Sequence, residues 1–139
     1  MNVAIDLDVL GDTRPLWRDW LEDASRVLDV RDLPDDRVAA AAELDARGAG
    51  NWRILLERFA EDRAPIYLRP AAEVSEALRA LQADGSRVVV FSDAPAELAR
   101  VALRQLGAER RVEGLEPVPP AAAVVVRTRA ELLALRRSA

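Results

Sequence analysis

Two pairs of polar residues follow apolar segments of this 139-residue chain. Asp6 and Asp8 come after Asn2–Ile5, and Ser92 and Asp93 come after Arg87–Phe91. Two carboxylates at this spacing point in different directions, so one can attack a substrate while the other serves as general acid and base. A hydroxyl with free backbone N–H groups at a helix start is suited to bind an anion. A carboxylate beside an anion site is what phosphoryl transfer through an aspartyl-phosphate requires.

The composition restricts the chemistry to carboxylates, hydroxyls and arginines. The chain has no cysteine and no histidine, which excludes thiolate and imidazole metal sites, a cysteine nucleophile and a Ser-His-Asp triad. All 20 basic residues are arginine, and a net charge of -4 disfavours a nucleic-acid partner. The apolar runs are too short to cross a bilayer, and no signal-peptide pattern opens the chain, so we expect a cytoplasmic protein with no membrane contact.

The elements that must position these residues alternate between strand and helix. Short apolar runs without alternation are typical of buried parallel strands, and we predict strands at 2–7, 87–91, 112–118 and 124–126. Helical periodicity predicts helices over 70–85, 95–107 and 128–136, the last opened by a Thr128–Glu131 capping box. The predicted fold class is α/β, a small parallel Rossmann-like sheet sandwiched by helices.

A helical segment interrupts this pattern after the first strand. Helical spacing predicts helices at 13–28, 34–48 and 51–62, the first capped by Asp12 or Thr13. Five of the six aromatic residues lie in this segment, and we expect its tryptophans (Trp17, Trp20 and Trp52) to be packing residues. We therefore predict a core formed by residues 1–12 and 70–139 and a helical cap formed by residues 13–69.

Ligands of open parallel sheets bind beyond the carboxyl ends of the strands. Besides the two polar pairs, this edge would receive Arg127 and Thr128, which follow the last predicted strand. We predict that Ser92, Asp93 and Arg127 bind the substrate, although Asp93 is also suited to cap the helix that follows it. The predicted ligand is a small phosphorylated molecule.

Two motifs in this order resemble those of the haloacid dehalogenase-like hydrolases, in their phosphoglycolate-phosphatase-like branch. The first is Val3–Thr13; the second is Leu78–Asp93, and the helix after it, Glu97–Gly107, is similar as well. The resemblance implies that Asp6 is the nucleophile, that Asp8 is the general acid and base, and that Ser92 holds the transferring phosphoryl group. It also implies that residues 13–69 are the cap that excludes water and selects the leaving group.

The resemblance further implies a Mg²⁺ ion held by the Asp6 carboxylate, the Asp8 carbonyl and a later acid, but the chain departs from the family there. Val9 stands where the family has a glycine after its second aspartate, and the lysine of the third motif is absent. The acidic pair of the fourth motif is replaced by Arg127-Thr128-Arg129. Since a fixed positive charge repels a divalent ion, we predict that Arg127 or Arg129 neutralises Asp6 and Asp8 in place of the metal.

Two functions therefore remain open at the level of the sequence. The first is a slow phosphomonoester phosphatase that acts through Asp6 on a small phosphorylated metabolite. The second is a catalytically degenerate domain of the same type that binds an anion or a protein partner, as in a homodimer through the aromatic cap. The first is preferred because the nucleophile, its partner acid and the phosphate-site hydroxyl are all present.

Overall fold

A four-stranded parallel sheet is the centre of the fold. The computed structural model describes residues 1–138, with side chains described through residue 135. The strands are β1 (Asn2–Asp6), β2 (Arg87–Phe91), β3 (Gly114–Glu116) and β4 (Val124–Val126), in the spatial order β3-β2-β1-β4. All neighbours are parallel, which confirms the predicted α/β Rossmann-like class. The two central strands therefore carry the two polar pairs, side by side at the same edge.

The apolar strand sequences form the core because one face of the sheet is fully covered. In the register, Val3 lies beside Val88, and Ile5 lies between Val90 and Val126. These side chains are at most 2% exposed and belong to the hydrophobic core. The helices of this part of the chain are α5 (Ala72–Ala83), α6 (Ala96–Gln105) and α7 (Arg129–Ser138), with a 3₁₀ turn at Glu109–Arg111. Burying these branched side chains is the main stabilising contribution of the sheet.

The exit from the first strand is a helical turn, where we expected the strand to continue and then a loop. Strand β1 ends at Asp6, and α1 (Leu7–Leu10) follows directly. The Asp6 carboxylate caps this turn by accepting a hydrogen bond from the Asp8 N–H. Leu7 and Leu10 are buried, so the turn is fixed to the core and holds both aspartates in defined positions.

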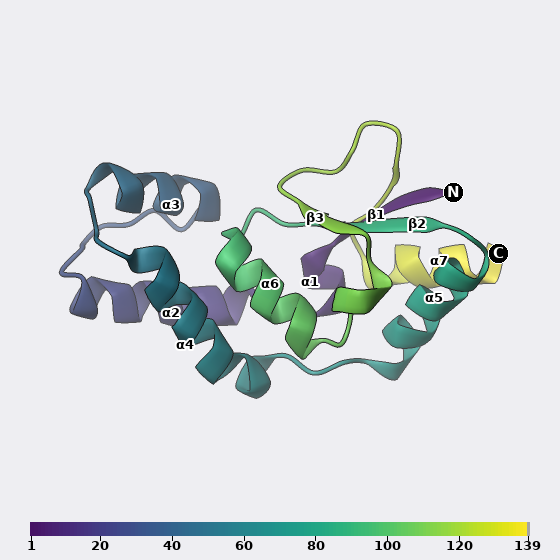
Figure 1. Ribbon diagram of the computed structural model, residues 1–139, viewed down its shortest axis with the longest axis horizontal. Coiled ribbons are helices and arrows are strands. Elements are labelled where there is room, and N and C mark those ends of the chain that lie inside the picture. Colours follow the sequence, from purple (N-terminus) through teal and green to yellow (C-terminus); the bar gives the residue numbers. More distant parts are fainter. Residues whose placement is uncertain (139) are drawn as a thin grey trace.

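The predicted cap segment contains three helices that lie beyond the carboxyl ends of the strands, at the left of Figure 1. They are α2 (Arg14–Val27), α3 (Arg37–Ala46) and α4 (Trp52–Tyr67). Helix α4 continues past its predicted end at 62 and contains Pro65 in its last turn. Trp20 packs edge-to-face on Phe59 with ring centroids 5.7 Å apart, as expected for packing residues.

Helix α3 begins three residues later than predicted. Asp36 has an extended backbone conformation, and its carboxylate accepts a hydrogen bond from the Ala39 N–H at 2.8 Å. This is the geometry of an N-cap, so the helix begins at Arg37 and not at Pro34. The shift places Arg37 in the first turn, directed at the sheet.

The link from β3 to β4 is a seven-residue stretch without a helix, residues 117–123, which rises at the top of Figure 1. Parallel crossovers usually contain a helix, so this short link is a distinctive feature of the fold. Its first residues lie over the carboxyl edge of the sheet, as the next subsection describes. Within the part of the chain that the structure describes, no helix is long and apolar enough to cross a membrane.

Candidate functional site

The predicted site residues meet in one cavity of about 360 Å³ at the carboxyl edge of the sheet. Its lining comprises Asp6, Asp8, Arg14, Arg37, Phe91, Ser92, Asp93, Pro117, Val118, Pro119 and Arg127. Five of the residues named from the sequence are among them (Asp6, Asp8, Ser92, Asp93 and Arg127), whereas Thr128 and Arg129 are not. The parallel register explains this, because Asp6 pairs with Phe91 and β4 ends beside β1.

Asp6 stands at the end of the central strand, half-buried. Its Oδ1 accepts the Asp8 N–H at 3.0 Å, whereas Oδ2 accepts no hydrogen bond from the described residues. Burial raises the pKa of the Asp6 carboxyl above its ordinary value. The hydrogen bond from Asp8 opposes this increase, the Asp8 charge adds to it, and the charges of Arg127 and Arg37 oppose it. Asp6 therefore presents one free carboxylate oxygen to the cavity.

Asp8 is fully engaged by other protein groups. Its Oδ1 accepts hydrogen bonds from the Thr13 N–H at 3.0 Å and the Thr13 hydroxyl at 2.6 Å. Its Oδ2 accepts a hydrogen bond from Arg37 Nη2 at 3.2 Å. Thr13 precedes α2 but makes no side-chain cap, because its hydroxyl is used here. A general acid must carry a proton to a leaving group, and this carboxylate has both oxygens occupied as acceptors.

Ser92 and Asp93 follow β2 in a turn that precedes α6. The Ser92 hydroxyl oxygen accepts the Ala94 N–H at 3.1 Å, and Ser92 N–H donates to the Glu116 carbonyl at 3.0 Å. The N–H groups of Ser92 and Ala94, which we expected to be free for an anion, are thus occupied. The Ser92 hydroxyl proton stays available as a donor. Asp93 does not cap α6, which begins after Pro95, and instead binds Arg37.

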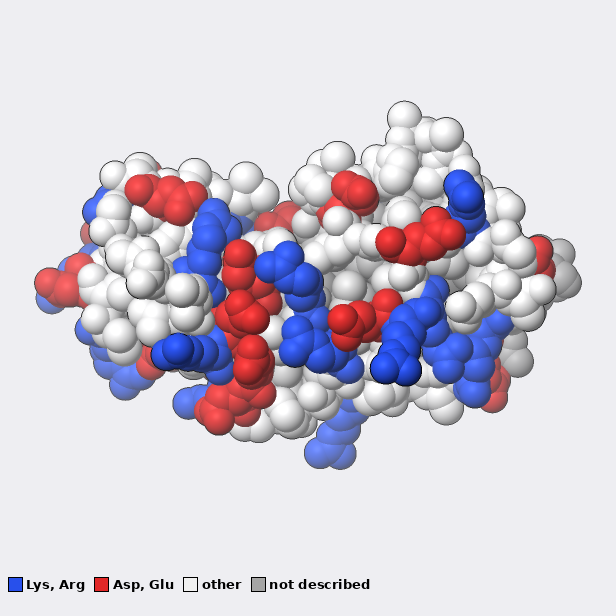
Figure 2. Space-filling view, viewed as in Figure 1, with Lys and Arg blue, Asp and Glu red and all other residues white. Residues whose placement is uncertain are grey.

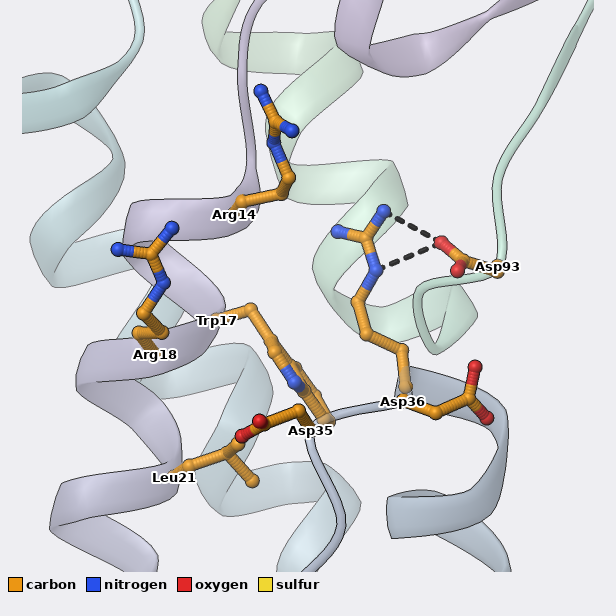
Figure 3. Close-up of a pocket in the computed structure, with 8 residues that line it drawn as sticks. Arg14, Trp17, Arg18, Leu21, Asp35, Asp36 and Asp93 are labelled. Carbon is orange, nitrogen blue, oxygen red and sulfur yellow. Dashed lines mark hydrogen bonds and ion pairs between the residues drawn. The ribbon is translucent and has the colours of Figure 1, made fainter.

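Arg37 is the residue that sequence reasoning missed. Its guanidinium contacts Asp93 Oδ1 from Nε at 2.7 Å and from Nη2 at 2.5 Å, and Nη1 donates to Thr13 Oγ1 at 2.6 Å. In Figure 3 the dashed lines that end at Asp93 mark these two contacts. The residue is only 8% exposed. A cation in the first turn of a helix is disfavoured by the helix dipole, and that was the available sequence signal for a tertiary partner.

The prediction that Arg127 or Arg129 neutralises both aspartates is corrected by this arrangement. Arg129 lies outside the cavity and approaches Glu73 at 3.6 Å. Arg127 lines the cavity and lowers the pKa of Asp6, but its guanidinium stacks on the Phe91 ring, 5.1 Å from the centroid. The arginine that binds Asp8 is Arg37, whose side chain reaches the sheet edge from the first turn of α3.

The residues present do not fit a Mg²⁺ ion. Such an ion requires near-octahedral oxygen ligation with one or two free carboxylates. Among the described residues no three acidic side chains are grouped to hold a metal, and the residue that follows β4 is Arg127. At ~4 Å and an effective dielectric of ~20, the repulsion between a guanidinium and a divalent ion is about 8 kcal/mol. The Arg37 charge beside Asp8 therefore opposes a metal at this point.

A second cavity, of about 330 Å³, adjoins the first on the cap side. Helix α2 supplies Arg14, Trp17, Arg18 and Leu21, and Asp35 and Asp36 face them across the cavity (Figure 3). Arg14, Arg37 and Asp93 line both cavities. The Arg37–Asp93 ion pair thus stands where the two cavities meet.

Comparison with known proteins bears on the fold. No protein-family model matches the chain, and no curated protein is similar to it in sequence. Among solved structures, it is similar to the "putative beta-phosphoglucomutase from Thermotoga maritima", with a TM-score of 0.53 and 19% identity. The match covers 89% of this chain and 74% of that chain. The chain has a haloacid dehalogenase-like fold. The haloacid dehalogenase-like arrangement explains why the two motifs converge, and at this identity it establishes nothing about activity.

Proposed function

We propose that this chain binds a small phosphorylated molecule in the 360 Å³ cavity at the carboxyl edge of the sheet. The observation that carries the proposal is that this cavity is lined by two hydrogen-bond donors that are not engaged by other described residues. The Ser92 hydroxyl has a free proton, and the Arg127 guanidinium forms no ion pair with any described residue. Charged and hydroxyl donors together are suited to the oxygens of a phosphoryl group.

The 360 Å³ cavity would hold the phosphoryl group of the ligand. The adjoining 330 Å³ cavity would hold the rest of the ligand. Phe91 supports the Arg127 guanidinium from β2, so this donor is held near the end of β4. Arg14, which lines both cavities, already binds Asp12 through Nε at 2.8 Å. Arg18, by contrast, has no partner among the described side chains and is available to a polar group of the ligand.

Binding is favoured over catalysis because Asp8 is not free. In the phosphatase hypothesis this residue exchanges a proton with the leaving group, whereas here it accepts three hydrogen bonds from Thr13 and Arg37. The phosphatase hypothesis also relies on Mg²⁺, and the donor set does not fit that ion. We therefore place the degenerate, ligand-binding alternative first.

A slow phosphatase that acts through Asp6 is the second candidate. It is favoured by one observation, the free Oδ2 of Asp6 in the same cavity as Ser92. Hydrolysis of a generic aryl phosphate by the wild type and by Asp6→Asn tests it. A rate that disappears in the variant would support the enzyme, and equal background rates in both proteins would eliminate it.

Calorimetric titration with inorganic phosphate tests the binding proposal. We expect binding by the wild type and a loss of about tenfold or more, ~1.4 kcal/mol, in Ser92→Ala and in Arg127→Ala. Arg129→Ala is the matched control, since that arginine lies outside the cavity, and its affinity should be unchanged. Equal affinity in all four proteins would show that phosphate binds elsewhere and would contradict the proposal.

A further inference from the structure

We infer that the Arg37 guanidinium is a built-in cation that takes the place of a divalent metal, so that the site binds phosphate without Mg²⁺. For its ligand the inference rests on the proposed function. For the metal it rests only on the surroundings of Arg37. The haloacid dehalogenase-like fold would lead one to expect a metal at this edge, and the chain supplies an arginine from its own cap.

The guanidinium of Arg37 is held in a fixed position by its contacts with neighbouring side chains. The side chain is 9% exposed and reaches two carboxylates, Asp8 and Asp93, and the buried Thr13 hydroxyl. A guanidinium has five N–H groups in a rigid plane. Here Nε, Nη1 and Nη2 each donate one hydrogen bond, and Nη2 also lies 2.5 Å from Asp93 Oδ1 as an ion pair. The remaining N–H on Nη1 is free to donate to a ligand oxygen.

The charge of Arg37 is stabilised by the carboxylates that it contacts, and not by the dipole of its own helix. The residue occupies the first turn of α3, where the aligned peptide dipoles disfavour a cation. Asp36 fixes that turn by capping Ala39, so the arginine is carried to the sheet edge by a rigid element. The favourable contacts are with residues 29 and 56 positions away in the sequence.

The charges around the cavity balance without a metal. Three carboxylates, Asp6, Asp8 and Asp93, and three guanidinium groups, Arg14, Arg37 and Arg127, line it. Asp8 and Asp93 are both bound to Arg37, which leaves Asp6 as the one carboxylate of these three without an arginine contact among the described side chains. A divalent ion would have to displace a buried guanidinium to obtain a second carboxylate.

Two measurements on the full chain test the inference. The first is calorimetric titration with inorganic phosphate in EDTA and in millimolar Mg²⁺. We expect the wild-type affinity to agree within about twofold in the two buffers and Arg37→Ala to bind about tenfold more weakly in EDTA. Arg37→Lys, which keeps the charge without the fork, should lie between them, and Arg129→Ala should match the wild type.

The second measurement is thermal unfolding with Mg²⁺ alone, which needs no phosphate binding. We expect Mg²⁺ to leave the wild-type melting temperature unchanged and to raise that of Arg37→Ala, where Asp8 and Asp93 have lost their counter-charge. If Arg37→Ala does not fold, Arg37→Lys with its more mobile ammonium takes its place and should show a smaller rise in the same direction.

The outcomes separate this inference from the proposed function. Mg²⁺ that stabilises the wild type, or that phosphate binding requires, would overturn the built-in cation while leaving the phosphate site intact. Absence of phosphate binding in every buffer would overturn the proposed function, and the Mg²⁺ melts would still decide the role of Arg37. A variant without Arg37 that gains no response to Mg²⁺ and keeps full phosphate affinity would contradict the inference.

Discussion

Asp6 and Asp8 differ in the hydrogen bonds of their carboxylates, although they lie only two positions apart at the end of the same strand. Asp6 keeps one oxygen unbound, and burial is the largest influence on it, raising the pKa of its carboxyl. Asp8 has donors on both oxygens. These two carboxylates thus make different contacts: Asp6 presents a free oxygen to the cavity, and Asp8 connects the sheet edge to Arg37 of α3.

The raised pKa of Asp6 predicts how its substitution changes stability with pH. A carboxyl whose pKa is higher in the folded state than in the unfolded state favours folding while protonated and opposes it once ionised. Asp6→Asn should therefore melt a few degrees above the wild type at pH 7. This difference should shrink as the pH falls through the Asp6 pKa toward the ordinary aspartate value of ~4. Melting curves across this range check it, and a variant that is less stable at every pH would contradict it.

At the scale of elements, the first turn of α3 decides where the cap meets the sheet. The Asp36 carboxylate caps this turn, and the next residue, Arg37, crosses to Asp8 and Asp93. Asp36 is the N-cap of α3, and the next residue, Arg37, forms the ion pairs with the core. The stability of the start of α3 is therefore coupled to the connection between α3 and the core. The helix start is consequently part of the site.

This coupling predicts an effect of Asp36→Ala beyond the helix. Losing an N-cap carboxylate costs about 1 kcal/mol of unfolding free energy. We also expect weaker phosphate binding, since Arg37 loses its fixed support. Asp35→Ala is the matched control, because Asp35 is an exposed neighbour with no described hydrogen bond. Denaturant unfolding and phosphate titration of both variants check this, and equal losses in the two would refute the coupling.

On the scale of the whole molecule, the predicted cap and core share one hydrophobic cluster. Helix α4 packs along α6, and Arg53 of α4 approaches Glu97 of α6 at 3.3 Å. Figure 2 shows acidic and basic side chains interleaved over the face viewed there. Buried residues of α2, α4 and α6 belong to the same cluster as those of the sheet, so the two segments are stabilised by the same burial.

A shared core predicts that the chain unfolds in one transition. Since opening the cap would expose apolar surface that the core also needs, we expect coincident denaturant curves from tryptophan fluorescence, which reports on the cap, and from far-UV circular dichroism. Two separated transitions would show that residues 13–69 are an independent unit. The homodimer through the cap stays a prediction, which sedimentation of the wild-type chain would check.

The residues that could act, and the edge of the sheet at which they lie, were predictable from the amino-acid sequence. Strand hydrophobicity is local, and the parallel arrangement follows from it, so Asp6, Asp8, Ser92, Asp93 and Arg127 could be placed at one edge before any coordinates. The types of the strands and of the longer helices were predictable for the same reason, whereas the helical turn α1 was not. The exact ends of the elements were less predictable, because they depend on side-chain capping and packing. Examples are α1, the start of α3 and the continuation of α4 past Pro65.

The identity of the arginine that binds Asp8 and Asp93 could be learned only from the folded chain. Twenty arginines are chemically alike in the sequence, and those nearest the expected position were Arg127 and Arg129. Arg37 and Asp8 are 29 positions apart in the sequence, and no local pattern specifies that the Arg37 side chain reaches Asp8. Electrostatic partnership depends on distance in space, and the packing of the cap sets that distance.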